Sequence, residues 1–385
     1  MGCAVKIMMS AGETSGDLHG AQLIAAIKRQ SPTTEIIAFG GDNMAKEGAR
    51  LLKNFAGYNV MGVWEVIKNL RRIFALLDFL EARMREEKPD LLVLIDYPDF
   101  NWRLAKRAKK LSIPVFSYIP PSAWAWRKGR AKTCAKIADE FVAIFPFELP
   151  VYEKAGAKIS FLGNPLVDKV RGDLTEEEAR DFFQIPKGKH AVLLLPGSRL
   201  QEIKLLLPTM LAAAEKILQA RPDTLFFLPV ASADVEAAIR EQVTKSPIEI
   251  KLTKSHRYDL MGLADVAMAT SGTVVLEAAL MGLPCVSLYR MAKFNYCLGR
   301  LLVHIDNFTL PNILMNSRVQ PELLQDEVEP GRIAAEILSL YRGEEKRAKT
   351  VAGLKEACSK LGQPGAADRI AAKILAAAKR GGKAT

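Results

Sequence analysis

The stretch that decides the fold is residues 4–30, AVKIMMSAGETSGDLHGAQLIAAIKRQ. Its first six residues form a nearly continuous apolar run, which is typical of a strand covered on both faces. A turn containing Gly12 and Gly16 follows, and apolar residues then recur at helical spacing from Leu18 to Gln30. Strand, turn and helix in this order form the repeating unit of a parallel α/β sheet.

The same pattern recurs along the chain. Further strands are expected at 36–39, 91–95, 114–118, 141–144, 159–162, 191–195, 225–228, 248–252, 265–269 and 284–288. Helices are expected at 101–110, 175–183, 209–220, 274–281, about 331–342, 345–360 and 365–380. The pattern predicts two doubly wound parallel sheets, which also suits 385 residues. We expect an N-terminal lobe of residues 1–165, a C-terminal lobe of 166–345, and C-terminal helices in 346–385 that pack on the first lobe or on a partner subunit.

Composition indicates an ordinary globular protein with an anionic partner. The chain is 49% hydrophobic and has a net charge of +11, and residues 68–136 alone hold 16 basic and 7 acidic residues. Such a surface favours a phosphorylated substrate, an anionic membrane or nucleic acid, or simply solubility. Five scattered cysteines, four dispersed histidines and the lack of a signal-peptide pattern predict a cytoplasmic protein without disulfides, protein-bound metal or cofactor.

Loops after strands are the places to look for a site, because ligands of open α/β sheets bind there. The first is Gly12–Asp17, where the backbone of Gly12 and Gly16 admits a close ligand and Glu13 disfavours pyrophosphate. An ordinary turn with Asp17 as helix cap is the alternative. The third strand ends in DYPDFN, residues 96–101, where Asp96 and Asp99 are general-base candidates or helix caps.

The segment PPSAWAWR, residues 120–127, joins a rigid loop to Trp124, Trp126 and a basic run. Aromatic rings beside cations suit sugar stacking, phosphate contact or a membrane interface, although paired tryptophans also occur as simple packing.

The second lobe offers a nucleotide site. Arg199, in LPGSR, can form a charged fork onto a diphosphate. Ser271, Gly272 and Thr273 place hydroxyls and backbone N–H groups at a helix start, which suits phosphate. Glu277 lies one turn further along an apolar helix, where an unpaired carboxylate is costly, so it is expected to accept ribose hydroxyls.

These motifs together resemble the two-lobed GT-B glycosyltransferases, and more closely the lipid-A-disaccharide synthase family. The matching segments are AGETSGD (11–17), DYPDFN (96–101), PSAWAWR (121–127), LPGSR (195–199), SGTVVLE (271–277), YRM (289–291), LPN (310–312) and LQDE (324–327). They span residues 11–327 in the family's order, and AGE-x-SGD with PSAWAW is the most specific combination.

The resemblance implies an active site in the cleft between two Rossmann-like lobes. It implies inverting transfer of 2,3-diacylglucosamine from its UDP donor to the 6′-hydroxyl of 2,3-diacylglucosamine 1-phosphate (lipid X), giving the β-1,6 disaccharide 1-phosphate and UDP. The implied UDP site comprises Arg199, Ser271, Gly272, Thr273, Glu277, Asn312 and Gln325. The implied acceptor side has Asp99 as the base, with Glu13 and Asp96 as other candidates, and loop residues Gly12, Ser15, Gly16, Asp17, Ser122, Trp124, Trp126 and Asn164. Many members have His in place of Asn164, which leaves the role of this amide open.

Acylated substrates imply contact with a membrane. Residues 60–86 combine apolar side chains at helical spacing with Trp64, Arg71 and Arg72, as in an interfacial helix, although a helix facing the core shows the same pattern. We expect a monomer or homodimer at the inner membrane's cytoplasmic face. The alternatives are a UDP-N-acetylglucosamine 2-epimerase acting on a soluble UDP-sugar and, less favoured, a nucleic-acid binder or a dehydrogenase, because the chain lacks their motifs.

Overall fold

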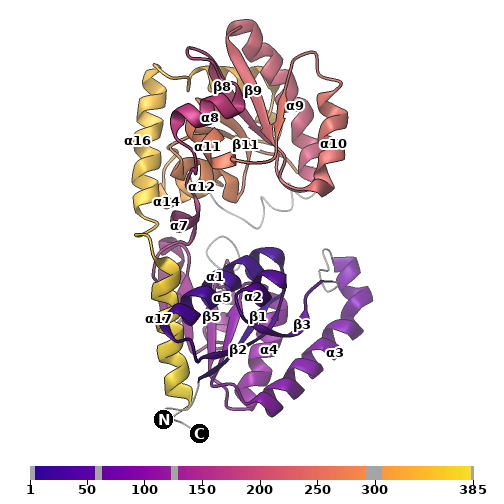
Figure 1. Cartoon of the computed structure of the whole chain (residues 1–385), viewed down its shortest axis with the longest axis vertical. Coiled ribbons are helices and arrows are strands. Elements are labelled where there is room, and N and C mark those ends of the chain that lie inside the picture. Colours follow the sequence, from indigo (N-terminus) through magenta and orange to yellow (C-terminus); the bar gives the residue numbers. More distant parts are fainter. Residues whose placement is uncertain (1–4, 57–62, 123–128, 292–305, 383–385) are drawn as a thin grey trace. The chain divides into compact units, whose positions relative to one another are not determined.

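The computed structural model describes residues 5–56, 63–122, 129–291 and 306–382, with the backbone alone for 63–69 and 129–130. It forms two compact units, Met1–Pro165 with Gly362–Thr385, and Leu166–Leu361 (Figure 1). Each contains one parallel sheet between helices, which confirms the predicted α/β class. Among the described residues, no helix is both long and apolar enough to cross a bilayer.

In the first unit the strand order is β3 (Arg50–Asn54), β2 (Glu35–Gly40), β1 (Lys6–Ala11), β4 (Leu91–Ile95), β5 (Val115–Tyr118), β6 (Glu140–Ala143) and β7 (Ile159–Phe161). The helices are α1 (Thr14–Gln30), α2 (Asp42–Lys46), α3 (Val63–Glu87), α4 (Pro98–Lys110), α5 (Gly129–Cys134), the 3-10 turn η1 (Pro146–Glu148), α6 (Leu149–Glu153) and α17 (Ala366–Gly381). Successive residues of β1 serve opposite faces: Ile7 and Met9 pack in the cluster with α1 and α17, whereas Met8 packs in the cluster with α3 and α4.

In the second unit the order is β10 (Lys251–Thr253), β9 (Thr224–Pro229), β8 (His190–Leu195), β11 (Val266–Thr270), β12 (Cys285–Tyr289) and β13 (Glu322–Leu324). The helices are α7 (Leu166–Lys169), α8 (Glu176–Phe183), α9 (Leu200–Ala220), α10 (Ala233–Val243), α11 (Arg257–Leu263), α12 (Thr273–Leu280), α14 (Leu310–Met315), the 3-10 turn η2 (Gln325–Glu327), α15 (Pro330–Leu338) and α16 (Glu345–Ser359). Both sheets reverse their order of connection beside the first strand, at β1/β4 and β8/β11.

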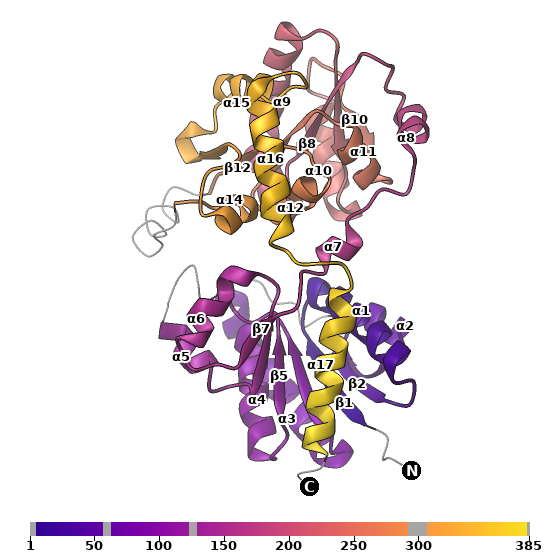
Figure 2. The same cartoon turned by 90° about the vertical axis from the view of Figure 1, so that its left-hand side faces the viewer.

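The C-terminal helices in residues 346–385 divide between the units, so the expected packing on the first lobe holds for α17 and not for α16. Helix α16 belongs to the second unit, whereas α17 packs beside α1 on the first sheet (Figure 2). Buried Ile370, Ile374 and Ala378 join the apolar cluster there. The buried carboxylate of Glu140 also forms ion pairs with Lys373 and Arg380 of α17. The physical reason is that α17 has its own apolar face, which fills the surface of the first sheet beside α1.

Candidate functional site

A pocket of about 510 Å³ opens at the carboxyl ends of strands β8–β11 in the second unit. Its position is the β8/β11 reversal point of the sheet, where α/β folds bind ligands. The predicted residues Arg199, Ser271, Gly272, Thr273 and Glu277 all line it. The structure therefore brings this set together.

Arg199 immediately precedes α9. Glu202 contacts both its backbone and its guanidinium, yet the guanidinium remains accessible to a ligand. The carboxylate of Glu202 accepts hydrogen bonds of 3.4 Å from both the backbone N and Nη1 of Arg199. The Arg199 side chain is 70% exposed, so a ligand diphosphate can compete for the guanidinium. Gly197 has φ +111, and a Cβ there would lie 2.2 Å from Glu202 Oε2, so this turn requires glycine.

Helix α12 starts directly beneath the pocket, with Gly272 as its N-cap residue. The first backbone N–H groups of the helix lack intrahelical acceptors and suit an anion. Ser271 Oγ donates to the Phe308 carbonyl at 3.2 Å, so its hydroxyl is already anchored and can serve a ligand as an acceptor.

Glu277 is buried, with 7% of its surface exposed, and has two partners that sequence reasoning missed. Arg257 Nη2 and Tyr258 OH each donate to Glu277 Oε1 at 2.9 Å. Burial and the charge of Glu277 both act to raise the pKa of Tyr258. The signal was present in the sequence, because a buried carboxylate needs a partner and RY follows directly after the loop of β10.

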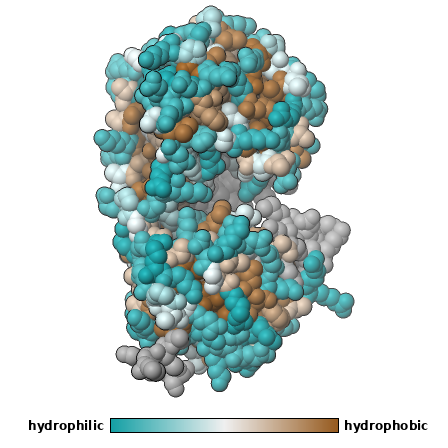
Figure 3. Space-filling view, viewed as in Figure 1, coloured by the Kyte–Doolittle hydropathy of each residue, from teal (hydrophilic) through white to brown (hydrophobic). Residues whose placement is uncertain are grey.

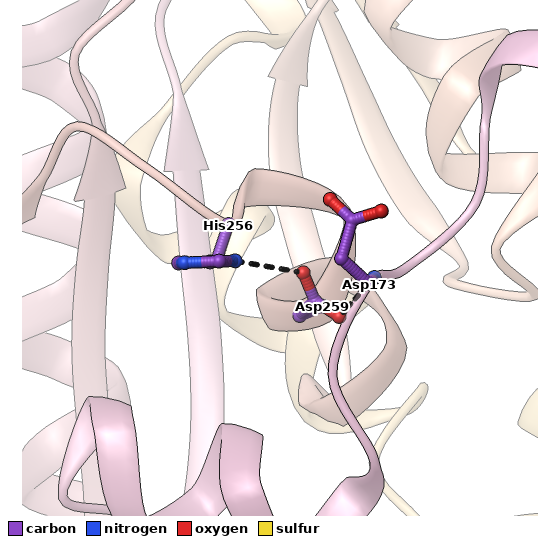
Figure 4. Close-up of side chains that lie close together, drawn as sticks. All are labelled: Asp173, His256 and Asp259. Carbon is purple, nitrogen blue, oxygen red and sulfur yellow. Dashed lines mark hydrogen bonds and ion pairs between the residues drawn. The ribbon is translucent and has the colours of Figure 1, made fainter.

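His256 also lines the pocket and belongs to a small cluster (Figure 4). Its Nδ1 lies 3.4 Å from Asp259 Oδ2, and Asp259 Oδ1 accepts from the backbone N atoms of Asp173 and Leu174. One ligand-type atom of each of Asp173, His256 and Asp259 lies within 4.8 Å of the other two, and Figure 4 marks the contact of His256 with Asp259. Asp259 therefore anchors the chain at 173–174, and the cluster is read as a structural one.

Asn312 and Gln325 were expected to bind UDP. In the structure, the side-chain amides of both residues form hydrogen bonds with the protein backbone. Asn312 is fully buried, donates to the Gln320 carbonyl and accepts from the backbone N atoms of Val319 and Gln320. Gln325 exchanges two hydrogen bonds with the backbone of Met291. Neither lines the described part of the pocket. Both hold loops in place, because a buried amide must satisfy its donors and acceptors nearby.

In the first unit, the ends of β1 and β4 bring Gly12, Glu13 and the 96–99 segment together. The Tyr97 ring lies against Gly12, where a Cβ would come within 2.2 Å of Tyr97 Cδ1. Burial first, and then the charges of Glu13 and Asp99, raise the pKa of Tyr97. Both carboxylates therefore lie near this phenol, with Asp99 exposed and Glu13 half-buried.

The turn after β4 is conformationally strained. Asp96 and Tyr97 have φ values of 47° and 51°, in the left-handed region that such residues rarely occupy. Asn101 holds the turn by accepting from Ser10 Oγ at 2.6 Å and donating to the Asp96 carbonyl at 2.6 Å. Burial raises the pKa of Asp96.

Asp17 is engaged by α2 and does not cap its own helix. Its carboxylate accepts hydrogen bonds from the backbone N atoms of Gly41, Asn43 and Met44 and so caps α2. The alternative of a cap was right in kind, but the capped helix is a different one. Gly16 is buried against Ala11, and Ser15 is exposed on the first turn of α1.

Other expected acceptor residues are more dispersed. Asn164 is 1% exposed and donates to the Ile144 carbonyl at 2.9 Å, and Ser122 is exposed. Trp124 and Trp126 lie outside the described residues.

The sequence analysis did not single out Glu148, which follows β6. Its side chain is 4% exposed, and burial raises its pKa to about 8, with a further contribution from the charge of Asp96.

Helix α3 has both buried and exposed apolar residues. Leu76, Leu77 and Leu80 are buried in the core, whereas Leu70 and Phe74 remain about 40% exposed. Arg71 and Arg72 are exposed, and Trp64 lies in the part of α3 whose side chains are outside the description. Figure 3 shows apolar side chains reaching the surface of this unit among hydrophilic ones.

Comparison with known proteins covers almost the full chain. The family model for lipid-A-disaccharide synthetase matches residues 7–375. The chain belongs to the lipid-A-disaccharide synthase family. The lipid-A-disaccharide synthase of Syntrophus aciditrophicus is 40% identical over 375 residues, 97% of this chain and 98% of that one. That of Geobacter sulfurreducens is 40% identical over 370 residues, 96% of each chain. Lipid-A-disaccharide synthases are glycosyltransferases, as the motifs had implied.

Solved structures with this fold include the glycotransferase of kitacinnamycin, with a TM-score of 0.68 and 15% identity, covering 97% of this chain and 99% of that one. UDP-N-acetylglucosamine 2-epimerase from Neisseria meningitidis, bound to UDP-GlcNAc, has a TM-score of 0.65 at 13% identity, covering 97% and 100%. At these identities the likeness concerns the fold, and it confirms the GT-B architecture for this lipid-A-disaccharide synthase family member.

Proposed function

We propose that this chain transfers 2,3-diacylglucosamine from UDP-2,3-diacylglucosamine to the 6′-hydroxyl of 2,3-diacylglucosamine 1-phosphate, releasing UDP. The pocket of the second unit is the observation that supports this proposal. It combines a guanidinium, a helix start and a buried carboxylate, which match the diphosphate and ribose of a UDP donor.

In this proposal Arg199 and the N–H groups at the start of α12 stabilise the negative charge of departing UDP. Glu277 Oε1 is engaged by Arg257 and Tyr258, so Oε2 is the oxygen that accepts from ribose hydroxyls. Arg257 thereby fixes the position of the carboxylate. Direct UDP contacts of Asn312 and Gln325 are not part of the proposal, since their amides are already bonded.

Inversion at the anomeric carbon needs one base to take the proton of the acceptor hydroxyl. We assign this role to Asp99, because it is exposed at the start of α4; like Glu13, the other candidate, it lies near the Tyr97 phenol. Asp96 is more enclosed and supports the turn. Transfer requires the donor bound to the second unit to reach the acceptor bound to the first.

The test is a radiolabelled transfer assay with UDP-diacylglucosamine and diacylglucosamine 1-phosphate. Asp99→Asn should lower kcat about 10²–10⁴-fold, since a general base contributes that much. Arg199→Ala should weaken UDP binding by roughly 10-fold or more, since it removes a charged hydrogen bond. Glu153→Gln, an exposed substitution on α6, is the control. Near wild-type kcat in Asp99→Asn would remove Asp99 from the role of base.

The same assay separates this reaction from epimerisation of a soluble UDP-sugar. An epimerase would act on UDP-N-acetylglucosamine without any acylated acceptor, and the full-length family match does not favour it. Product formed only when both acylated substrates are present supports the transferase.

We further propose that the enzyme binds the inner membrane peripherally through α3, on the cytoplasmic side. Exposed Leu70 and Phe74 beside Arg71 and Arg72 form a surface that suits an anionic bilayer. Charge reversal of both arginines should reduce sedimentation with phosphatidylglycerol vesicles, and salt should weaken the wild-type interaction. Unchanged sedimentation of the reversed variant would count against α3 as the membrane contact.

A further inference from the structure

A second hollow, of about 650 Å³, lies between α3 and α4 of the first unit. Six of its eight lining residues come from α4, and four of these are Asp99, Arg103, Lys106 and Lys110. Their spacing of four, three and four places them on one face of the helix, at rises of about 6, 10 and 16 Å from Asp99. The proposed base thus begins a stripe that continues as three cations.

The cations of this stripe are available to a ligand. Arg103, Lys106 and Lys110 are exposed, and none forms an ion pair among the described residues. This differs from two neighbours on the same helix. Arg107 is paired with Asp78 and Glu81, and Lys109 with Asp139 and the Lys136 carbonyl. A row of cations without ion pairs in the described part of the chain attracts an anionic ligand.

The hollow also has an apolar side. Phe74 of α3 is 42% exposed, and the guanidinium of Arg103 lies 5.5 Å from its ring centroid. Half-buried Trp102 lines the same hollow. Apolar rings beside phosphate-binding cations suit a ligand that has both an acyl chain and a phosphate.

We propose that this hollow binds the phosphate of the acylated acceptor, with Arg103 and Lys106 on the phosphate and Phe74 and Trp102 against the acyl chains. This rests on the proposed transferase function and names the acceptor subsite within it. The acceptor hydroxyl lies at Asp99 and its phosphate lies one to two helical turns along α4, so the sugar bridges the two. The row of cations then selects an acceptor that is phosphorylated.

The experiment compares two acceptors with short, soluble acyl chains, 2,3-diacylglucosamine 1-phosphate and its dephosphorylated form. The double variant Arg103→Ala/Lys106→Ala should raise KM for the phosphorylated acceptor roughly 10- to 100-fold, the effect of losing charged hydrogen bonds. Its kcat should stay within a few-fold, and its KM for the dephosphorylated acceptor should not change. Lys109→Ala, whose cation is already paired, is the matched control and should keep the wild-type preference.

Other outcomes have separate meanings. Absence of transfer by the wild type would overturn the proposed function, and calorimetric binding of the short-chain phosphorylated acceptor would still test the hollow. Equal KM for both acceptors in the wild type, or an unchanged preference in the double variant, would overturn the subsite. A variant that loses only phosphatidylglycerol vesicle binding while its acceptor KM is unaltered would also overturn it, because the stripe would then recognise bulk membrane. Thermal unfolding confirms that the double variant is folded.

Discussion

At the scale of single residues, Asp17 and Glu277 show that the surroundings of a buried carboxylate decide whether it stabilises the fold or remains available to a ligand. Asp17 and Glu277 both follow a glycine-containing loop, and both are almost fully buried. Asp17 accepts hydrogen bonds from three backbone N–H groups, so its carboxylate serves the fold. Glu277 is fixed through one carboxylate oxygen, and its other oxygen remains for a ligand in the pocket. Sequence reasoning left Asp17 open between a ligand loop and a cap of its own helix, because the sequence does not show that α2 starts beside Asp17.

Glu148 provides a prediction of pH dependence. With a pKa of about 8 in the folded chain, it retains a proton between about pH 4.5 and pH 8 that the unfolded chain has released. The free energy of unfolding should therefore fall as pH rises through this window, by at most about 1.4 kcal/mol per pH unit from this group. Glu148→Gln should flatten this slope and be more stable than wild type at pH 8.

Urea unfolding of both proteins at pH 5, 6, 7 and 8 measures the effect. Glu153→Gln, on the exposed face of α6, should retain the wild-type slope. If the Glu148→Gln and wild-type curves stay parallel across these pH values, burial of Glu148 does not control its protonation.

At the scale of elements, the buried strands were predictable, whereas two of the four edge strands were not. β3 and β13 were missed, and each lies at the edge of its sheet. β3 has charged Arg50 and Lys53 and is largely exposed, and β13 is only three residues long, so neither shows the continuous apolar run of a central strand. Helix α9 begins at Leu200 although Pro208 lies within it, because burial of Ile203, Leu206 and Leu207 outweighs one lost hydrogen bond.

Helix α17 gives the prediction for this scale. Ile374 is fully buried in the cluster that α17 shares with α1 and the first sheet. Ile374→Ala should lower the free energy of unfolding of the first unit by about 2–5 kcal/mol, because it leaves a cavity. Denaturant unfolding followed by hydrogen exchange assigns the loss to a unit. Lys379→Ala, exposed on the same helix, should have little effect, and an equal loss in both variants would refute the packing argument.

At the scale of the whole molecule, the sequence predicted the α/β class, two sheets and the switch-point loops, because continuous apolar strands and glycine turns are local features. It did not predict the pairing of Arg257 and Tyr258 with Glu277 or the internal use of Asn312. Those depend on which loops meet after folding. The sequence showed that a buried Glu277 needs a partner, but it did not show which residues would meet it. The division of the C-terminal helices was missed for the same reason.

UDP binding should slow backbone hydrogen exchange in the second unit and not in the first. Every residue that lines the nucleotide pocket belongs to the second unit. Saturating UDP should therefore slow backbone hydrogen exchange at residues 195–202 and 270–277, with a stabilisation of about 2.7 kcal/mol at 100-fold excess over Kd. Residues 12–17 should exchange at the unliganded rate. Protection confined to the first unit would show that the nucleotide binds elsewhere.

Because α17 packs on the first sheet, the two units complete their folding in a different order from their synthesis. The amino-terminal half leaves the ribosome first, but its apolar surface beside α1 stays uncovered until residues 366–381 emerge. The second unit, which is contiguous from Leu166 to Leu361, can complete its core earlier. The unit encoded first is thus finished last, and a ribosome that stalls near the end of the message would release a chain with one finished unit and one open sheet.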